Sequence, residues 1–162
     1  MLRFDGRRLA GGSIFSMEFR VKVVLGDWRM LGREAAAVRQ EVFVREQGVP
    51  VDLDMDQNDA EALHAVARSP EGLAVATARL LDDGHLGHLG RMAVLRTWRG
   101  QGVGGLMLRT LVEVAKERGL DRVLLSAQVH AQGFYEAAGF EAYGEPYLDA
   151  GMAHIGMLRH LG

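Results

Sequence analysis

The sequence lacks cysteine and long apolar runs, and it contains only three prolines among its 162 residues. Without cysteine the chain has no disulfide, no zinc–thiolate site and no thiol nucleophile, which fits a reducing compartment. Without a run of about 18 apolar residues, it has no segment suited to spanning a membrane. We therefore expect a cytoplasmic protein with no membrane partner.

An excess of charge of one sign is also missing. The 19 basic residues nearly balance the 21 acidic ones, and the formal net charge is −2. Because proteins bind nucleic acid largely through a surplus of positive charge, this balance argues against a nucleic-acid partner. Hydrophobic residues make up 48% of the chain and charged residues 25%, which is typical of a globular domain.

The first 16 residues differ from the rest of the chain. They are rich in glycine and arginine, and they lack the continuous apolar stretch of a secretory signal. We expect residues 1–16 to be a disordered extension, with Met17 as a candidate natural start. Residues 17–162 are long enough to form one domain with its own core.

Apolar periodicity predicts alternating strands and helices. Residues 19–24 alternate between apolar and polar side chains, which indicates a half-buried strand, and residues 28–46 carry apolar side chains at helical spacing. Asp27 precedes that helix as a candidate N-cap, and Gly48 to Pro50 end it. The further predicted elements are strands 63–67, 73–81 and 88–94, helix 102–118, strand 123–127, helix 131–138 and a closing hairpin within 143–158. This order indicates one mixed α/β domain.

Five acidic residues follow the first predicted helix, namely Asp52, Asp54, Asp56, Asp59 and Glu61. A calcium loop starting at Asp52 fails, because Gln57 and Leu63 stand where an EF-hand needs glycine and glutamate. We interpret the run as a solvated acidic loop, and we hypothesise that it draws cationic substrates toward the site. His85 and His88 have a His-x-x-His spacing but no evident third ligand, so we expect no metal.

The most informative stretch is a glycine-rich turn, Arg99–Gly105, between a predicted strand and a predicted helix. Glycine lets the backbone approach a ligand closely, and the start of a helix presents unpaired N–H groups at the positive end of its dipole. Together these features suit a phosphate or a pyrophosphate. A turn whose glycines only permit a tight bend has the same composition, and that alternative stays open.

Two other phosphate-binding motifs compete for this turn. Gly100-x-Gly102-x-x-Gly105 literally satisfies the dinucleotide fingerprint. However, residues 95–99 separate it from the preceding strand, and no acidic residue ends the next strand, which closes at Gln128. A P-loop is excluded because no Gly-Lys-Ser/Thr occurs. The context therefore argues against a dinucleotide site.

The turn resembles a motif of the GNAT superfamily of N-acetyltransferases. Residues 99–104, Arg-x-x-Gly-x-Gly, are similar to its (Gln/Arg)-x-x-Gly-x-(Gly/Ala) signature. Residues 128–140, Gln-x-x-Ala-x-x-x-Tyr-x-x-x-Gly-Phe, are similar to its second motif, which usually has Asn where this chain has Gln128. Residues 41–50 and His154-x-x-Met157 resemble the ElaA/YjcF-like branch. The resemblance covers residues 17–162 and identifies them as an N-acetyltransferase domain.

The resemblance implies an α/β (α+β) fold, with a mixed, mostly antiparallel, twisted sheet of about six to seven strands, splayed in the middle and flanked by about four helices. It also implies acetyl-CoA as cosubstrate, in a cleft between the strand ending at Val94 and the strand ending at Gln128. Amides of the glycine-rich turn would hold the pyrophosphate, and residues 92–94 would pair with the pantetheine arm as an added strand does. The implied coenzyme-A-binding residues are Met92, Ala93, Val94, Arg99, Gly100, Gln101, Gly102, Val103, Gly104, Gly105 and Gln128.

Acetyl transfer to an amine needs a neutral amine, a stabilised oxyanion and a proton for the leaving thiolate. The family commonly places the thiolate's general acid at the position of Tyr135, although a tyrosine on a short helix is also an ordinary core residue. An alkyl ammonium has a pKa near ~10.4 and must lose a proton before attack. The base stays open between His154, Glu46 and a chain of water molecules. An N–H near residues 92–94 would face the thioester oxygen.

Three functions of different classes follow. The first is an acetyl-CoA-dependent N-acetyltransferase that works by direct attack, and the second is a non-catalytic acyl-CoA-binding or sensing module. Tyr135 in the motif favours the first, and Gln128 in place of Asn favours the second. A dinucleotide-dependent oxidoreductase is weakened by the motif context. The acceptor stays open between a small amine, an amino acid, a peptide terminus and a protein lysine, and the family often forms homodimers.

Overall fold

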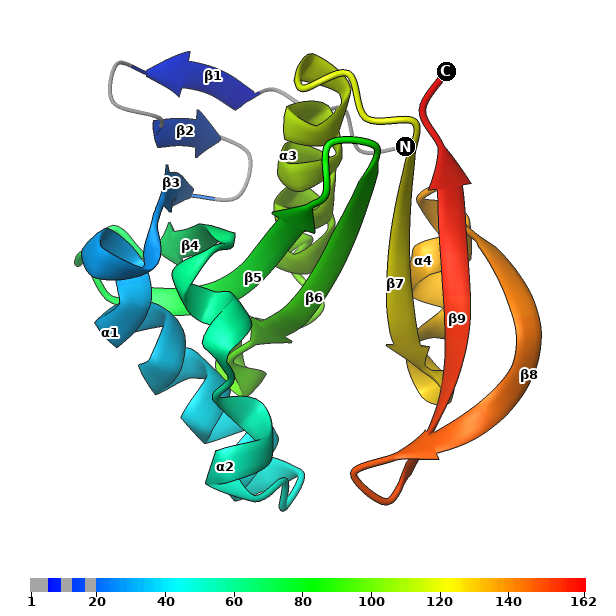
Figure 1. Cartoon of the computed structure of the whole chain (residues 1–162). Helices are drawn as coiled ribbons and strands as arrows, with labels where there is room; N and C mark the ends of the chain where they lie inside the picture. Colours follow the sequence, from blue (N-terminus) through cyan, green and yellow to red (C-terminus); the bar gives the residue numbers. More distant parts are fainter. Residues whose placement is uncertain (1–5, 10–12, 17–19) are drawn as a thin grey trace.

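The computed structural model describes residues 6–9, 13–16 and 20–162, whose strands form one sheet in the order β1-β2-β3-β4-β5-β6-β7-β9-β8 (Figure 1). The strands are β1 Gly6–Leu9, β2 Ser13–Ser16, β3 Val21–Gly26, β4 Leu63–Arg68, β5 Ala74–Asp82, β6 Leu86–Val94, β7 Arg122–Gln128, β8 Glu141–Asp149 and β9 Met152–His160. The α-helices are α1 Trp28–Arg39, α2 Val51–Asp54, α3 Val103–Glu117 and α4 Gln132–Ala137. In this described sheet only β6 and β7 pair in parallel.

The seven strands β3–β9 and the four helices agree with the expected architecture. The expected hairpins and the order of helices and strands are confirmed, with boundaries that shift by a few residues. β1 and β2 form an antiparallel hairpin that continues the sheet beyond β3. They lie within the extension for which we predict disorder, and that disorder and the domain boundary at Met17 stay predictions. No helix among the described residues is long and apolar enough to cross a membrane.

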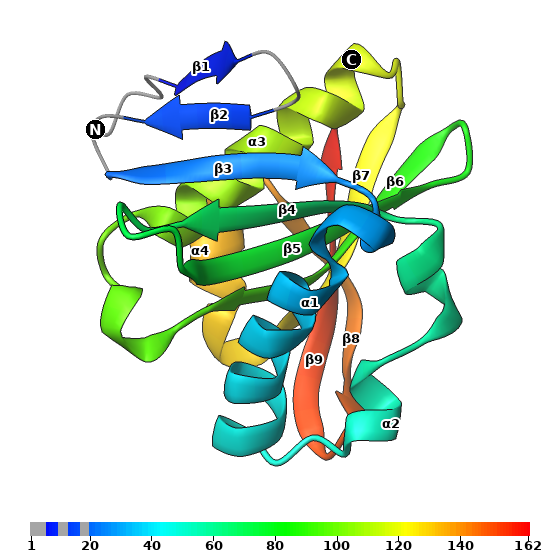
Figure 2. The same cartoon turned by 90° about the vertical axis from the view of Figure 1, so that its left-hand side faces the viewer.

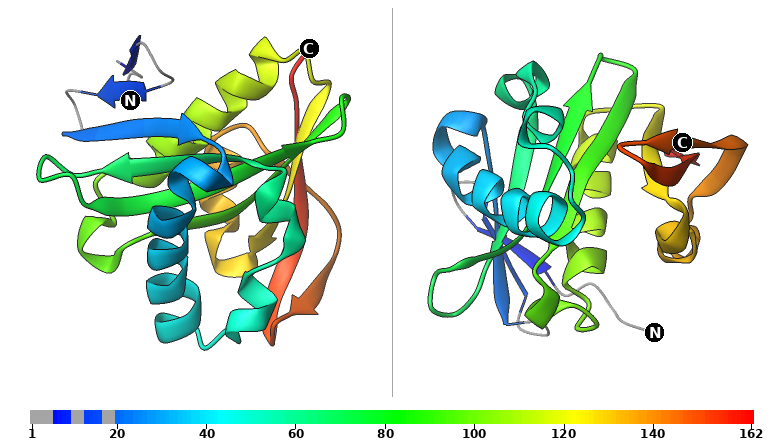
Figure 3. Two further views of the ribbon diagram at one scale, coloured as in Figure 1. Left: turned by 60° about the vertical axis from the view of Figure 1, so that its left-hand side comes forward. Right: turned by 90° about the horizontal axis from the view of Figure 1, so that it is seen from below.

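Helices cover both faces of the sheet because strand side chains alternate between the two faces. On β3, Val23 belongs to the core that contains Leu106 and Leu111 of α3. The next residue, Val24, belongs to a separate cluster with Leu31 and Ala35 of α1. Figure 2 shows α1 in front of β4 and β5, and the right-hand view of Figure 3 shows α1 and α3 on opposite sides of the strands.

The first helix begins as predicted, because the Asp27 side chain accepts a hydrogen bond of 3.0 Å from the backbone N–H of Met30. The helical pattern continues to Glu46, but Gln40–Glu46 is wound as a wider π-helix. Periodicity alone predicts a uniform α-helix here, so this change of winding is a correction. π-Helical turns occur mostly at functional sites. This one carries Val42 and Phe43 to the wall of the cavity described below.

The sheet splits between β6 and β7. These strands pair only from Leu86 to His88 on β6 and from Arg122 to Leu124 on β7. Beyond those residues they diverge, as Figure 1 shows between the green and the yellow strands. The implied splay is therefore present, and it leaves one edge of each strand without a partner strand over the described residues that follow.

A β-bulge interrupts β6 at the start of the splay. Thr77 of β5 pairs with Ala93, whereas Arg79 pairs with Gly90, so Arg91 and Met92 together face a single residue of β5. Arg91 has a φ of 53°, a left-handed conformation that is unfavourable for a side chain of this kind. The bulge re-aims Arg91 and bends β6 away from β7.

Candidate active site

The split sheet opens a cavity of about 950 Å³. Its wall contains residues from β5, β6, β7, α4, the start of α3, the end of the π-helical turn and the β8–β9 hairpin. The sequence-predicted site residues that line it are Met92, Ala93, Val94, Arg99, Gly100, Gly102, Val103, Gly104, Gly105, Gln128, Tyr135 and His154. Gln101 does not line it, because its side chain is exposed and donates to the carbonyl of Thr97 at 3.1 Å.

The glycine-rich turn forms the mouth of α3 at one end of the cavity. Gly100 and Gly102 have φ values of 75° and 85°, which only glycine adopts readily. Gly102 caps the helix, and the first backbone hydrogen bond back to it comes from Leu106 at 3.0 Å. The N–H groups of residues 103–105 therefore make no hydrogen bond within the helix, and they lie at the positive end of the helix dipole. This geometry suits a phosphate group.

Arg99 is bound within the protein by its backbone and by its side chain. Its N–H donates to the carbonyl of Arg96 at 3.2 Å, so this amide differs from the free group that we expected. Its Nε donates to the carbonyl of Val94 at 2.9 Å, and its Nη2 donates to Glu46 at 2.9 Å. Arg99 thus fixes the turn against the end of β6. The same contact occupies the Val94 carbonyl.

Glu46, one of the candidate bases, lies outside the cavity. It accepts from Arg99, its other oxygen lies 3.6 Å from Arg96, and it lines a separate groove beside α1. Both carboxylate oxygens of Glu46 face arginine side chains, and the residue does not line the cavity in which the acceptor would bind. The structure therefore leaves His154 and water as candidate bases.

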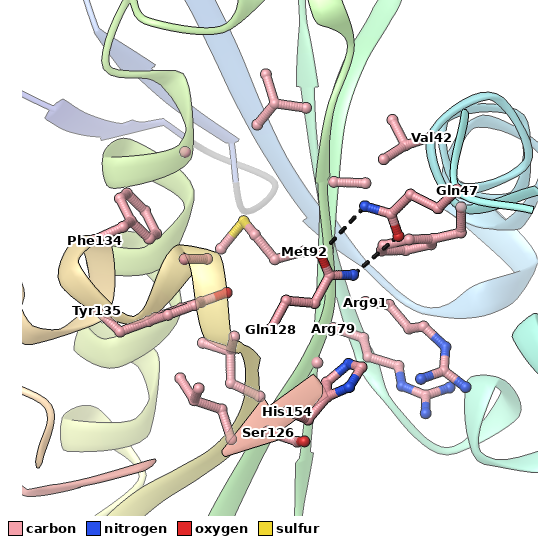
Figure 4. A pocket seen from close by; sticks show the side chains of 18 of the residues that line it. Val42, Gln47, Arg79, Arg91, Met92, Ser126, Gln128, Phe134, Tyr135 and His154 are labelled. Carbon is pink, nitrogen blue, oxygen red and sulfur yellow. Dashed lines mark hydrogen bonds between the residues drawn. The ribbon is translucent and has the colours of Figure 1, made fainter. Parts of the chain in front are cut away.

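Tyr135 is a buried residue of α4 whose hydroxyl points into the cavity (Figure 4). Its ring packs edge-on against Phe134 and Phe140, with centroid distances of 5.0 and 6.1 Å. Burial raises the pKa of the Tyr135 phenol to about 12, because the ionised form loses its hydration. The phenol is therefore protonated throughout the physiological range. Core packing and access to the cavity are combined in one residue.

His154 lies on β9 directly opposite Gln128 of β7, and it is buried. Its Nδ1 lies 2.8 Å from the carbonyl of Met152, which can only accept, so Nδ1 carries the ring proton of the neutral form. Nε2 then has the lone pair that a proton acceptor needs. The ring of Tyr147 stacks on His154 at 6.1 Å, and the Tyr147 hydroxyl is hydrogen-bonded to Ser126. These contacts fix the imidazole.

Two glutamine side chains meet across the cavity, which sequence analysis did not predict. Gln128 Nε2 donates to Gln47 at 2.9 Å, and Gln47 Nε2 donates back at 3.3 Å (Figure 4). His130 Nε2 also lies 2.6 Å from the same Gln128 oxygen. Gln128 replaces the usual Asn and is one methylene longer, which extends its reach toward Gln47. Gln128 in place of Asn was the one feature of the sequence that could have indicated this contact.

The expectation of a solvated acidic loop is wrong for Asp54, Asp56 and Asp59, whereas Asp52 and Glu61 are exposed. Asp54 and Asp59 are buried, and both bind Arg39, whose guanidinium also lies 5.6 Å from the ring of Trp28. Arg39 Nη1 donates to Asp59 at 2.8 Å, and its Nε lies 3.3 Å from Asp54. The run looked solvated because its arginine partners come from distant elements of the sequence.

Arg79 and Arg91 complete this buried ionic cluster, which consists of Arg39, Arg79, Arg91, Asp54, Asp56 and Asp59. Arg79 donates to Asp56 at 2.7 Å and to Asp59 at 2.9 Å, and Arg91 donates to Asp56 at 3.2 Å. Three cations balance three anions. Our hypothesis that free carboxylates attract cationic substrates fails for Asp54 and Asp56, because arginines already bind them.

The cluster shifts the acidities of its members. The hydrogen bond from Arg79 lowers the pKa of Asp56, against the opposing effect of burial. Desolvation alone would raise the pKa of Asp59, but the hydrogen bonds and charges of Arg39 and Arg79 together lower it. Burial lowers the pKa of His64, whose Nε2 lies 2.8 Å from the Asp59 carbonyl. Both carboxyl groups are therefore ionised and His64 is neutral at pH 7.

No group of three His, Cys, Asp or Glu side chains suited to a metal ion occurs among residues 6–9, 13–16 and 20–162. A signal for Arg79 did exist in the sequence, because a charged residue inside the apolar run 73–81 must find a partner once that strand is buried. We did not use it. Arg91 gave no such signal, because the bulge that re-aims it is not visible in the periodicity.

The splayed sheet, the glycine-rich helix mouth and the cavity between them define the class of acyl-CoA N-acyltransferases. The chain belongs to the GNAT acetyltransferase family, because residues 33–161 match the domain described as "Acetyltransferase (GNAT) domain". Acyl-CoA is the cosubstrate that this family implies.

Within the family, the chain is similar to YjcF of Bacillus subtilis, described as an uncharacterized N-acetyltransferase, with 36% identity over 78% of this chain and 91% of YjcF. It is also 36% identical to the protein ElaA of Escherichia coli, over 76% of this chain and 84% of ElaA. The crystal structure of a putative N-acetyltransferase from Lactobacillus plantarum superimposes with a TM-score of 0.79 at 30% identity, covering 87% of this chain and 98% of that one. The predicted resemblance to the ElaA/YjcF-like branch is confirmed.

Proposed function

We propose that the protein transfers the acetyl group of acetyl-CoA to an amine by direct attack, without a covalent enzyme intermediate. One observation carries the proposal. The glycine-rich helix mouth, Tyr135 with its protonated phenol, and His154, whose Nδ1 is bound to the Met152 carbonyl, all line the same cavity. An anion-binding end, an acid and a base are the parts that this reaction needs.

The donor fits the glycine-rich end of the cavity. The N–H groups of residues 100 and 103–105 would hold the pyrophosphate at the positive end of α3. The edge of β6 beyond His88 lacks a partner strand, so Met92 and Ala93 offer backbone groups to the amide-rich pantetheine arm. Because the Val94 carbonyl already accepts a hydrogen bond from Arg99, we assign it no contact with acetyl-CoA. Gln128 would approach the arm from β7.

The chemistry then follows from the positions of three groups. His154 Nε2 accepts a proton from the ammonium, and the neutral nitrogen forms a bond to the thioester carbon. An N–H at the bulge near Met92 stabilises the oxygen that becomes negative. The carbon–sulfur bond breaks, and Tyr135 donates a hydrogen bond to the sulfur that leaves. The nitrogen loses its second proton to solvent as the amide forms, His154 returns its proton to solvent, and the released thiolate takes up a proton from solvent.

The pKa of Tyr135 limits what it supplies. A cysteine-like thiol has a pKa near ~8.5, so a phenol with a pKa of about 12 holds its proton more tightly than the departing thiolate would. The hydrogen bond, more than a completed proton transfer, is therefore the expected contribution. A hydrogen bond to a charged partner is roughly twice as strong as a neutral one, so the sulfur benefits most as its charge develops.

The test has two steps, binding and turnover. Calorimetric titration with acetyl-CoA is expected to show a 1:1 complex, with NAD(P)H as the non-binding control. Thiol release from acetyl-CoA is then followed with a panel of small amines, amino acids and short peptides. Binding without amine-dependent thiol release would instead support the non-catalytic acyl-CoA-binding module, and absence of binding would overturn both.

A further inference from the structure

The buried ionic cluster exposes arginine more than aspartate to the cavity. Arg79, Arg91 and Asp54 line the cavity wall, whereas Asp56 and Asp59 do not. The Asp54 side chain is only 4% exposed, while that of Arg91 is 29% exposed. The part of the cluster that a ligand meets is therefore mainly the Arg91 guanidinium.

The carboxylates of the cluster have little capacity left for further donors. Both Asp59 oxygens accept from Arg39, and one of them also accepts from Arg79. Both Asp56 oxygens accept from Arg79, and one also accepts from Arg91. Asp54 lies behind Arg39 and Arg91 with both oxygens in contact with Arg39. An ammonium group that enters the cavity thus finds no free carboxylate in this cluster.

Donor groups do remain. Arg91 uses Nε on the Asp54 carbonyl at 3.1 Å, and it uses Nη2 on the Leu53 carbonyl at 3.3 Å and on Asp56 at 3.2 Å. Its Nη1 has no partner among the described residues. Burial lowers the pKa of Arg91, and the charge of Arg79 beside it lowers it further. An additional anion at this position would relieve that repulsion.

The backbone of Arg91 is strained, and the contacts of the side chain hold the residue in this conformation. Its φ of 53° belongs to a conformation that costs a non-glycine residue free energy, and such outliers cluster at functional sites. The neighbouring Met92 lines the same cavity at the edge where the thioester is expected. The bulge therefore brings Arg91 and Met92 into the wall of the same cavity. Figure 4 shows the guanidinium groups of Arg79 and Arg91 beside each other, on the side of His154 away from Tyr135.

We infer that the acceptor is an amine that carries a carboxylate a few bonds from its nitrogen, with the carboxylate bound by Arg91 and the nitrogen at His154. A guanidinium with free N–H groups recognises a carboxylate in the plane of its fork. The same positive charge disfavours an acceptor with only an ammonium group. This inference rests on the proposed acetyl transfer, and it narrows the acceptor class toward amino acids and other amino-carboxylates.

The experiment compares matched acceptors with the full-length protein. L-Leucine, L-phenylalanine and β-alanine are each paired with the corresponding amide, and acetyl transfer is measured as kcat/KM by thiol release. The amide has the less basic nitrogen, so basicity alone favours it. The expected result is a kcat/KM at least about tenfold higher for the acid than for its amide in each pair that is acetylated, because only the carboxylate brings a charge opposite to that of Arg91.

Variants of Arg91 test the assignment. In Arg91→Gln the ratio of acid to amide is expected to fall at least about tenfold, and in Arg91→Lys it falls less, because the charge stays while the fork is lost. Arg118→Gln is the matched control, since Arg118 pairs with Asp82 and does not line the cavity, and its ratio is expected to equal that of the parent protein. Both acceptors are measured on the same preparation, so lower stability of a variant does not change the ratio.

The outcomes separate this inference from the proposed function. Acetylation of amides as fast as acids, or an unchanged ratio in Arg91→Gln, overturns the carboxylate site while acetyl transfer stands. If no amine in the panel releases thiol from acetyl-CoA, the acetyltransferase proposal fails and the acceptor inference fails with it.

Discussion

At the scale of single residues, Tyr135 carries a role in the core and a proposed role in the reaction. Its ring contacts Phe134 and Phe140, and its hydroxyl faces the cavity. Sequence reasoning identified the residue through its motif, but it did not reveal that burial raises the pKa of the phenol to about 12. Packing around the ring decides that value.

Replacing Tyr135 by Phe removes only the hydroxyl and keeps the ring contacts. We expect kcat for the best amine to fall about 10- to 100-fold, because the departing sulfur loses its hydrogen bond. The affinity for acetyl-CoA, measured by calorimetry, is expected to stay within about twofold. Turnover equal to that of the parent protein would remove Tyr135 from the reaction.

His154 offers a second test at this scale. Its Nδ1 is committed to the Met152 carbonyl, so only Nε2 can take a proton from the acceptor. In His154→Gln we expect the whole profile of kcat/KM against pH to drop, because the side chain no longer offers a proton acceptor. A profile that superimposes on that of the parent protein would assign the base to water. Tyr147→Phe serves as the comparison, because it keeps the stacked ring and removes the bond to Ser126.

At the scale of elements, the start of α3 depends on glycine in two different ways. Gly102 has a φ of 85° and so needs the absence of a side chain for its backbone conformation. Gly104 has no such requirement, and a Cβ there would meet Phe134 at an ordinary contact distance of 3.5 Å. The motif's tolerance of alanine at the second position thus has a steric explanation.

Gly102→Ala is expected to reduce acetyl-CoA affinity at least about tenfold, because a left-handed alanine costs about 1–2 kcal/mol and the amides of the turn lose their alignment. Gly104→Ala is the matched control and is expected to bind within about threefold of the parent protein. Titration calorimetry on both variants gives the comparison. Equal affinities for the two variants would show that the turn does not hold the donor through its backbone geometry.

Other elements needed the structure. The bulge in β6, the π-helical turn and the pairing of Gln47 with Gln128 leave no periodic trace in the sequence. The two glutamines are 81 positions apart, and their contact depends on how β7 and the first helix approach across the cavity. Local sequence patterns depend on the local backbone conformation. They therefore predicted the helices and strands, but not these contacts between distant residues.

At the scale of the whole molecule, the buried ionic cluster ties α1, α2, β5 and β6 together beside the cavity. Burying charges is costly unless all of them are paired, and here three arginines meet three aspartates. His64 belongs to the same region through its contact with the Asp59 carbonyl. The stability of the fold should therefore depend on pH through this cluster.

The direction in which stability changes with pH follows from the directions of the pKa shifts. His64 has a folded pKa below its ordinary value of 6.5, so below pH 6.5 the unfolded chain binds a proton that the folded protein does not, and stability falls as the pH drops. Asp56 and Asp59 have folded pKa values below 3.8, so their contribution is present above pH 3.8 and is lost as the pH falls through the lower folded values. Both effects destabilise the protein in acid.

Urea unfolding between pH 7 and pH 5 checks the part due to His64. We expect the free energy of unfolding to decline by up to about 1.4 kcal/mol per pH unit below 6.5. In His64→Gln that decline should be shallower, although the variant is less stable at pH 7. His160→Gln, at an exposed position, is expected to retain the slope of the parent protein. An identical slope in His64→Gln would mean that the buried imidazole does not control acid stability.

The amino-acid sequence alone was enough to predict the class of protein, most helices and strands, the glycine-rich turn before α3 and the motif that contains Tyr135. These features depend on short-range periodicity, on glycine conformation and on spacing within one motif. The tertiary structure decided which acidic residues are buried, that Glu46 lies outside the cavity and that Arg91 lines it. Those outcomes depend on contacts between residues far apart in the chain, where the free energy of burying a charge is set by partners that no local pattern names.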